Sequence, residues 1–205
     1  MALINQAKKE IQLKIVYYGP AQGGKTTNLE KVHSDVETEK ADEKGKLTSL
    51  ATSSDRTLFF DFLPMEALSI KGYRTKFQLF TVPGQVIYNT TRQLVLRGVD
   101  GIVFVADSQY SKMEENVESF TNMEDNLKTL NMRLADIPYV LQYNKRDLDN
   151  VAPMEYMEYL LNNREVEVPS VQSAALNGDG VFETLNMISR LLLHKFINER
   201  ARKAS

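Results

Sequence analysis

The sequence predicts an α/β fold in which a mostly parallel six-stranded sheet carries helices on both faces and contains one antiparallel strand pair. Short apolar runs bounded by turn residues alternate with segments of helical periodicity, which is typical of strands buried on both faces of a sheet. A glycine-rich turn also joins the first apolar run to the first helical segment. Ligands of such doubly wound sheets bind at the carboxyl ends of the strands, so functional residues are expected there.

The predicted elements follow one another in a regular order. A buried strand at 11–19 leads into a helix that begins at Lys25, and the polar segment 35–56 is expected to form a long mobile loop. Two strand-like runs, RTLFFDFLP and YRTKFQLFTV, are joined by about ten residues and predict the antiparallel pair. The remaining elements are a strand in GIVFVAD, a helix over 117–130, a strand in YVLQYNK, a helix that begins at Pro153, a weaker strand in VPSVQSA and a C-terminal helix over 182–196.

The composition is that of an ordinary globular protein and excludes several classes. Of the 205 residues 42% are apolar and 25% charged, and the net charge of −2 argues against nucleic acid as a partner. The absence of cysteine excludes disulfides, thiolate catalysis and cysteine-linked lipid anchors. No apolar run approaches the ~20 residues of a membrane helix, and the N-terminal residues resemble no signal peptide. We therefore expect a cytoplasmic monomer without a stable membrane anchor, built as one domain over 1–205 with a core over about 10–198 and a basic tail over 199–205.

Residues 19–26 read GPAQGGKT and fit the phosphate-loop pattern G-x-x-x-x-G-K-[ST], placed between a predicted strand and a predicted helix. The glycines let the backbone curl so that successive N–H groups meet phosphate oxygens at the positive end of the helix. Lys25 is expected to reach the β- and γ-phosphates, and the Thr26 hydroxyl to bind Mg²⁺. The residues predicted to bind the nucleotide in this loop are Gly19, Gln22, Gly23, Gly24, Lys25, Thr26 and Thr27.

Two later segments predict that the bound base is guanine. The stretch NKRD at 144–147 follows a predicted strand, and the carboxylate of Asp147 can accept hydrogen bonds from guanine N1–H and the 2-amino group, which adenine lacks. Asn144 is expected to tie this segment to the phosphate loop, and Lys145 to lie along the base. After the next strand a backbone N–H is expected to meet the guanine oxygen, within the segment formed by Ser173, Ala174 and Ala175.

The stretch TVPGQ at 81–85 lacks an acidic residue where one is expected. A chain with a phosphate loop usually carries a carboxylate at the end of a later strand, where it helps to hold Mg²⁺, but this strand ends in Thr81. Two interpretations stay open: a hydrolysing switch with a different metal arrangement, or a module that stays loaded with nucleotide and acts as a scaffold. A small kinase is a third interpretation, and the guanine-reading Asp147 argues against it.

These motifs resemble the small Ras-like GTPases over nearly the whole chain. The fit is closer to one bacterial branch, the MglA family of gliding-motility and cell-polarity GTPases, and it lies in the stretches KIVYYGPAQGGKTTNL, SSDRTLFFDFLP, FQLFTVPGQV, GVDGIVFVADSQ and PYVLQYNKRDL. The resemblance implies a Ras-like P-loop G domain that binds GTP and GDP with Mg²⁺ and hydrolyses GTP. In this family a threonine at the position of Thr81 is the rule, so TVPGQ is a feature of the lineage.

The resemblance also implies roles for residues beyond the phosphate loop. Gln85 corresponds to the glutamine that orients the attacking water, Gly84 to the nucleotide-binding glycine before it, and Thr57 to the switch threonine that contacts Mg²⁺. Arg56 corresponds to an arginine that the same chain supplies to the transferring phosphoryl group, so that the expected catalytic residues are Gln85, Arg56 and Lys25. The candidates that replace the missing carboxylate through water are Asp61 and Asp55.

The resemblance further implies partners that bind on the switch face. These are a Roadblock-type GTPase-activating protein (MglB-like) and effectors of polarity or motility, with recruitment to a cell pole. We expect intrinsic hydrolysis to be slow and stimulated by the activator, because Arg56 lies at the end of a polar loop. The chain departs from many Ras-like proteins in having no aromatic residue over 35–56 to stack on guanine, so stacking rests on Lys145.

Overall fold

One sheet with helices on both faces runs through the part of the chain that the computed structural model describes: residues 3–39, 48–52, 56–70, 72–85, 88–163 and 167–204, with the backbone alone for 3, 35–39, 48–52, 56–70 and 203–204. Its strands are β1 (Leu3–Asn5), β2 (Glu10–Tyr18), β3 (Thr48–Thr52), β4 (Arg56–Ile70), β5 (Tyr73–Thr81), β6 (Gly101–Asp107), β7 (Tyr139–Asn144) and β8 (Ser170–Gln172). The helices are α1 (Lys25–Glu39), α2 (Asn89–Leu96), α3 (Met113–Thr129), α4 (Met154–Leu161) and α5 (Val181–Ala204), with 3₁₀ turns η2 (Tyr110–Lys112) and η3 (Leu134–Asp136).

The strand order is β3-β4-β5-β2-β6-β7-β8, and β1 pairs with β2 off this path. Strand β2 runs parallel to β5 and β6, and β6, β7 and β8 continue the parallel series. Strand β4 runs antiparallel to β5, with Phe62 opposite Phe80, and is the predicted antiparallel pair. All six predicted strands are present, and the short strands β1 and β3 add two further antiparallel pairings. The predicted α/β class is confirmed.

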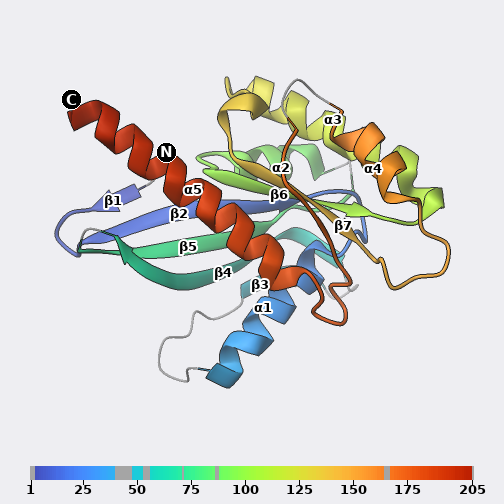
Figure 1. The fold of residues 1–205 in the computed structure, drawn as a ribbon, viewed down its shortest axis with the longest axis horizontal. Coiled ribbons are helices and arrows are strands. Elements are labelled where there is room, and N and C mark those ends of the chain that lie inside the picture. The colour runs from blue at the N-terminus through green and yellow to red at the C-terminus, as the bar shows by residue number, and fades with distance from the viewer. Residues whose placement is uncertain are drawn as a thin grey trace.

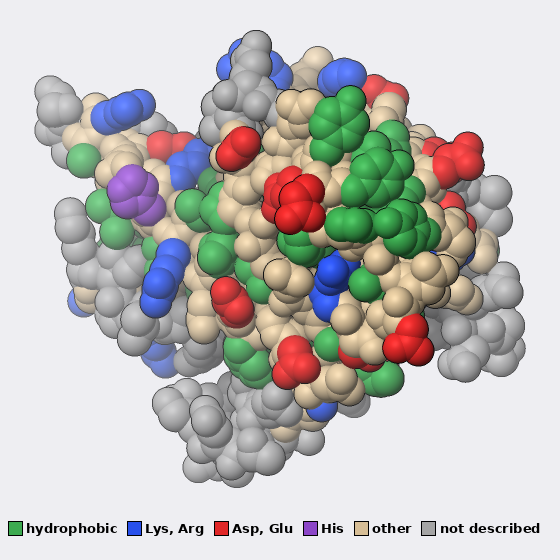
Figure 2. Space-filling model, turned by 45° about the vertical axis from the view of Figure 1, so that its right-hand side comes forward, with side chains coloured by type: hydrophobic (Ala, Val, Ile, Leu, Met, Phe, Trp, Pro, Cys, Tyr) green, Lys and Arg blue, Asp and Glu red, His purple; other side chains and the backbone are tan. Residues whose placement is uncertain are grey.

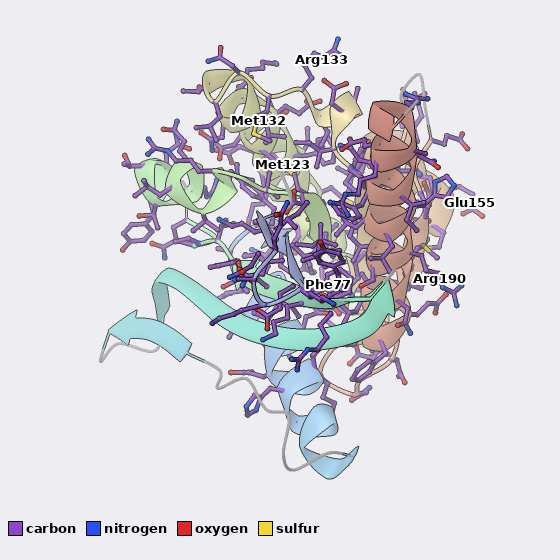
Figure 3. All side chains as sticks on the ribbon, turned by 90° about the vertical axis from the view of Figure 1, so that its left-hand side faces the viewer. Phe77, Met123, Met132, Arg133, Glu155 and Arg190 are labelled. Carbon is purple, nitrogen blue, oxygen red and sulfur yellow. The ribbon has the colours of Figure 1, made fainter. Side chains whose placement is uncertain are left out.

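The helices cover both faces of the sheet (Figure 1). On one face, buried side chains of α2, α3 and α4 pack with Phe104 of β6, whose ring lies 4.8 Å from that of Phe120 between centroids. On the other face, α1 and α5 pack on β2, β5 and β6. Figure 3 labels Met123 of the first layer and Phe77 of the second. Strands β6 and β7 are buried along their whole length, as central strands between two helical layers must be.

The prediction of a long loop over 35–56 is wrong for residues 35–39 and 48–52. Helix α1 continues to Glu39, and Thr48–Thr52 forms strand β3. Residues 35–39 read DVETE, and glutamate is a good helix former that extends the helix. Strand β3 pairs with β4. Without β3, the outer side of the long strand β4 would be an unpaired edge of the sheet.

The expected connection of about ten residues between the antiparallel strands is also wrong. Strand β4 continues to Ile70, and β5 begins at Tyr73. The turn includes Gly72 at φ +79°, a conformation that glycine adopts without steric cost and that tight hairpins require. The extra length of β4 pairs with the first half of β5, with Glu66 opposite Lys76.

Helix α5 continues as a helix through residues 199–204, the segment expected as a basic tail. Among the helices in the described ranges, none combines the length and the apolar character that a membrane crossing requires.

Turn η2 and helix α4 carry exposed aromatic side chains, with Tyr110 49% and Tyr159 67% exposed. Figure 2 brings this side of the molecule forward and shows hydrophobic side chains gathered there beside acidic ones.

A buried polar network ties β7 to both helices of the second layer. The Gln142 amide donates to Asn28 Oδ1 at 2.9 Å and to Thr184 Oγ1 at 2.9 Å, and Asn28 donates back to Gln142 Oε1 at 2.8 Å. All three side chains are 0% exposed. Asn28 also donates to the carbonyl of Gly24 at 2.9 Å, so the network reaches the glycine-rich turn.

Replacing Gln142 by leucine is expected to lower the free energy of unfolding by about 1–3 kcal/mol, because Asn28 Oδ1 is left buried without its donor. Urea unfolding followed by circular dichroism measures the change. The matched control is Gln172→Leu on β8, where the side chain is exposed and the same substitution should be nearly neutral. Equal destabilisation by the two variants would show that the buried hydrogen bonds of Gln142 contribute nothing to the free energy of unfolding beyond the general effect of replacing glutamine by leucine.

Candidate nucleotide-binding site

The glycine-rich turn lies at the carboxyl edge of the sheet, between the end of β2 and the first residue of α1. Gly24 has φ +102°, and a Cβ there would lie 2.1 Å from Asn144 Nδ2. No other residue fits this backbone position, because the left-handed conformation and the close approach both exclude a side chain. Gln22 also adopts the left-handed region at φ 58° although it is not glycine, and its side chain is exposed.

Lys25 is only 6% exposed and directs its ammonium group into the turn. It donates to the carbonyl of Gly19 at 3.0 Å and to that of Pro20 at 2.6 Å. Thr26 and Thr27 follow it in the first turn of α1 with half-buried side chains. A buried ammonium at the N-terminal end of a helix, surrounded by curled backbone, provides positive potential for phosphate groups.

Asn144, the last residue of β7, links three loops at this edge. Its Nδ2 donates to the carbonyl of Gly23 at 2.8 Å, and its Oδ1 accepts the backbone N–H of Ala175 at 2.9 Å. The expected tie between 144–147 and the phosphate loop is therefore present. The same side chain also holds the segment 173–175 beside that loop, which the sequence alone did not predict.

Lys145 is held by a buried acidic residue at the end of the neighbouring strand. Its Nζ lies 2.6 Å from Oδ2 of Asp107, which is 0% exposed. Asp107 also accepts from the backbone N–H and the side-chain amide of Gln109, both at 3.1 Å. Lys145 adopts φ +66°, so both its backbone and its ammonium group are constrained. This arrangement fixes the direction of the lysine side chain. The predicted position of Lys145 along the base requires such a fixed direction.

The other residues predicted to face the base lie on loops at the same edge of the sheet. Asp147 is exposed, and its neighbour Arg146 donates its backbone N–H to the carbonyl of Ser173 at 3.0 Å. The backbone N–H groups of 173–175 all have protein acceptors: those of Ser173 and Ala174 donate to the carbonyls of Tyr143 and Asp179, and that of Ala175 donates to Asn144. A guanine oxygen would therefore share or replace one of these acceptors.

The segment 82–85 lies directly against the phosphate loop. A Cβ on Gly84 would lie 2.3 Å from the Cα of Ala21, so only glycine permits this approach. Gln85 follows with a half-buried side chain. Thr81, at the end of β5, is 1% exposed and pairs with Tyr17 of the central strand β2.

Arg56 and Thr57, the predicted catalytic arginine and switch threonine, lie on β4, of which the backbone is described. Arg56 is its first residue and pairs with Thr52, and Thr57 pairs with Ala51. Asp61 pairs with Ser49 further along the strand. Asp55, the other metal candidate, lies outside the described residues. The structure thus brings the phosphate loop, 82–85, 144–147 and 173–175 together, and it positions the backbone of Arg56 and Thr57 at the start of β4.

The model of the ADP-ribosylation factor (Arf) family matches residues 1–192 of the chain. The protein is a Ras-like small GTPase of this family. It is 51% identical to the mutual gliding-motility protein MglA of Myxococcus xanthus over 193 residues, 94% of this chain and 96% of that one. The Ras-related protein SEC4 of Saccharomyces cerevisiae is 30% identical over 68% of this chain and 61% of its own. The uncharacterized protein MJ1339 of Methanocaldococcus jannaschii is 26% identical over 88% of this chain and 97% of its own.

Two polar residues of this GTPase, Asp107 and Arg92, were not identified from the sequence. Asp107 ends the otherwise apolar run GIVFVAD, and a carboxylate at the carboxyl end of a buried strand is the signal that could have identified it. Arg92 shares the buried stripe of α2 with Val95 and Leu96 and is 0% exposed. The spacing i, i+3, i+4 places all three on one helix face, and a charged residue within such a stripe is the corresponding signal.

Proposed function

We propose that this small GTPase is a switch that hydrolyses GTP to GDP and phosphate and binds its partners according to the bound nucleotide. The observation that carries the proposal is the position of Asn144, whose side chain joins the phosphate loop to the segment 173–175. The next residue, Lys145, is held by Asp107. Phosphate recognition and base recognition are thereby built into one connected edge of the sheet.

The residues at this edge fit a guanine nucleotide. Gly24 has no side chain, and this lets Asn144 pack against the turn 19–24. Lys25 points into the same turn. Its ammonium group and the backbone N–H groups at the start of α1 would neutralise the phosphates. The exposed carboxylate of Asp147 would accept the two donors of guanine, while Lys145 would lie along the base. Gln22, Gly23, Thr27 and Gly84 would complete the phosphate side, with Ser173, Ala174 and Ala175 on the base side.

Mg²⁺ accompanies GTP in this family, and it supplies charge that offsets the charge on the phosphate oxygens. The described residues contain no cluster of three acidic or histidine side chains that could hold a metal ion. Mg²⁺ keeps several waters and is bound largely through substrate phosphates, so a few protein oxygen ligands would suffice to hold it. Thr26 in the first turn of α1 and Thr57 on β4 would be the protein ligands. We propose Asp61 or Asp55, acting through water, as substitutes for the carboxylate that Thr81 replaces.

Hydrolysis would depend on positioning and charge, because phosphoryl transfer needs little covalent chemistry from the protein. Gly84 packs against Ala21, and Gln85 follows it beside the phosphate loop. Gln85 would therefore orient the water that attacks the γ-phosphate. Arg56 would stabilise the charge that develops on the transferring group, and Lys25 would hold the β- and γ-phosphates throughout.

The partners proposed for the switch follow from the relationship to MglA. That relative is named as a gliding-motility protein and is similar over 94% of this chain. We propose that this GTPase likewise controls cell polarity or motility in the cytoplasm, with recruitment to a cell pole. A Roadblock-type activating protein and polarity effectors would bind to the face formed by β4 and the segment 82–97, which the γ-phosphate orders.

Phosphate release from GTP with Mg²⁺, alone and with a Roadblock-type activator, tests this function. We expect slow release alone and a clear acceleration with the activator, because the activator would have to direct the Arg56 side chain to the transferring phosphoryl group. The competing candidate is a scaffold that stays loaded with GTP, which the missing carboxylate at position 81 would permit. Tight GTP binding without release under either condition would support the scaffold and reject the hydrolysing switch.

A further inference from the structure

Arg92 of α2 holds the two residues that immediately precede Gln85. Its Nε donates to the carbonyl of Pro83 at 2.9 Å, and its Nη2 donates to the carbonyl of Gly84 at 2.5 Å. The guanidinium group thus binds two successive carbonyls with two of its donors. Because Gly84 also packs on Ala21, its backbone is held between the phosphate loop on one side and Arg92 on the other.

The third nitrogen of the Arg92 guanidinium group links this segment to the neighbouring helix α3. Its Nη1 donates to Oδ1 of Asn122 on α3 at 2.5 Å, and the same oxygen accepts the Tyr18 hydroxyl at 2.7 Å. The guanidinium carbon lies 5.4 Å from the centroid of the Tyr18 ring. Burial raises the pKa of Tyr18, which keeps its hydroxyl protonated as a donor to Asn122.

A cluster of side-chain amides completes the contact between α2 and α3. Asn126 donates to Asn89 Oδ1 at 2.8 Å and to the Tyr18 hydroxyl at 3.1 Å, while Gln93 donates to Asn126 Oδ1 at 3.0 Å. Asn122 also donates to Asn89 at 3.2 Å. These hydrogen bonds satisfy the polar side chains of the cluster within the protein and determine how α2 packs on α3.

The acceptors of Arg92 are all uncharged. Among the described residues no carboxylate lies within ion-pair distance of its guanidinium group, which is 0% exposed. Burying a charge without an opposite charge is costly, and a buried methionine of similar length would avoid that cost. Arg92 instead supplies a planar fork of donors that binds two carbonyls and Asn122 at the same time. Methionine has no donor, and the ammonium group of a lysine lacks this fixed fork.

We propose that Arg92 is a positioning residue for GTP hydrolysis, which holds the segment 82–85 so that Gln85 faces the γ-phosphate and couples that position to α3. Its donors bind the carbonyls of Pro83 and Gly84 and the side chain of Asn122, so it would act on hydrolysis through the position of Gln85. The inference rests on the proposed role of Gln85 as the residue that orients the attacking water. It further requires that nucleotide affinity, which depends on the phosphate loop and 144–147, be independent of Arg92.

The test compares Arg92→Met and Arg92→Lys in the wild-type and Gln85→Ala backgrounds. Single-turnover hydrolysis is followed as the GTP and GDP extracted from the full-length protein, so that slow rates remain measurable, and affinity for a fluorescent GDP is measured in parallel. We expect Arg92→Met to lower the hydrolysis rate on the order of 10²-fold, the usual effect of a misplaced group, with GDP affinity unchanged. Arg92→Lys, which retains the charge but not the fork, should recover part of the rate.

In the Gln85→Ala background the same Arg92 variants should cause no further fall, because residues that act as a unit are not additive. Arg190→Met is the matched control, since Arg190 is an exposed arginine of α5 to which no role in the site is given. An undiminished rate in Arg92→Met, or an additional fall in the Gln85→Ala background, would overturn the inference. If Arg92→Met does not fold, Arg92→Lys and Asn122→Ser provide the same comparison. Unchanged hydrolysis in Gln85→Ala itself would instead reject the proposed role of Gln85.

Discussion

Replacing Arg56 by alanine is expected to lower activator-stimulated GTP hydrolysis by about 10³–10⁵-fold, the range over which an arginine stabilises the charge on a transferring phosphoryl group. Affinity for GTP and GDP should stay nearly unchanged, because the phosphate loop and 144–147 provide the ground-state contacts. The measurement is phosphate release at saturating activator, together with equilibrium binding of a fluorescent GTP analogue that the protein does not hydrolyse.

The backbone of β4 supports this expectation. Phe62 pairs with Phe80 near the end of β5, so the residues that precede Phe62 extend beyond the carboxyl end of that strand. This is the edge where the phosphate loop lies, and Arg56 begins the strand. Arg56→Lys is the matched control: it keeps a charge without the planar fork and should retain an intermediate rate. Full stimulated activity in Arg56→Ala would mean that the activator supplies the cation.

Replacing Asp147 by asparagine is expected to convert the preference for GTP into a preference for xanthosine triphosphate. A carboxylate accepts from guanine N1–H and the 2-amino group, whereas xanthine carries a carbonyl at that second position. The asparagine amide can donate to this carbonyl and still accept from N1–H. Because mismatched buried polar groups reject strongly, the ratio of the two affinities should change by about 10⁴-fold. Competition of the two triphosphates against fluorescent GDP measures this ratio.

The control for this prediction is Asp149→Asn, two residues further along the same exposed loop. The same change of charge there should leave the base preference as it is. A similar shift in both variants would attribute the effect to the net charge of the loop, and an unaltered preference in Asp147→Asn would reject guanine recognition by this carboxylate. Folding of each variant is checked by thermal unfolding, which an exposed substitution should alter little.

The elements of the second half of the chain were predicted well because their signals are local. Strands β6 and β7 are short apolar runs bounded by turn residues, and both form as predicted. The first half was harder because β3 and the extension of β4 are stabilised by pairing with each other and with β5. Strand propensity is weak evidence when the partner strand decides, so TSLAT was assigned to a loop. DVETE was assigned to the same loop because its residues are polar, although its glutamates favour a helix.

The candidate site divides in the same way. The glycines and Lys25 of the phosphate loop form a contiguous motif, since a curled backbone at the start of a helix needs these residue types next to one another. Asp107 and Arg92 carry no such motif. Asp107 is 38 residues from Lys145 in sequence, and Arg92 is 30 residues from Asn122.

By itself, the sequence determined the order of the strands and helices along the chain and the phosphate-loop motif, and it predicts the guanine-reading residues, because each depends on neighbouring residue types and their spacing. Only the tertiary structure decided that Asn144 joins three loops, that Asp107 holds Lys145 and that Arg92 holds the carbonyls before Gln85. The physical reason is that these acceptors are mostly backbone carbonyls, which every residue possesses. A hydrogen bond to such a group has no signature in the sequence, and it exists only once the chain has brought its donor there.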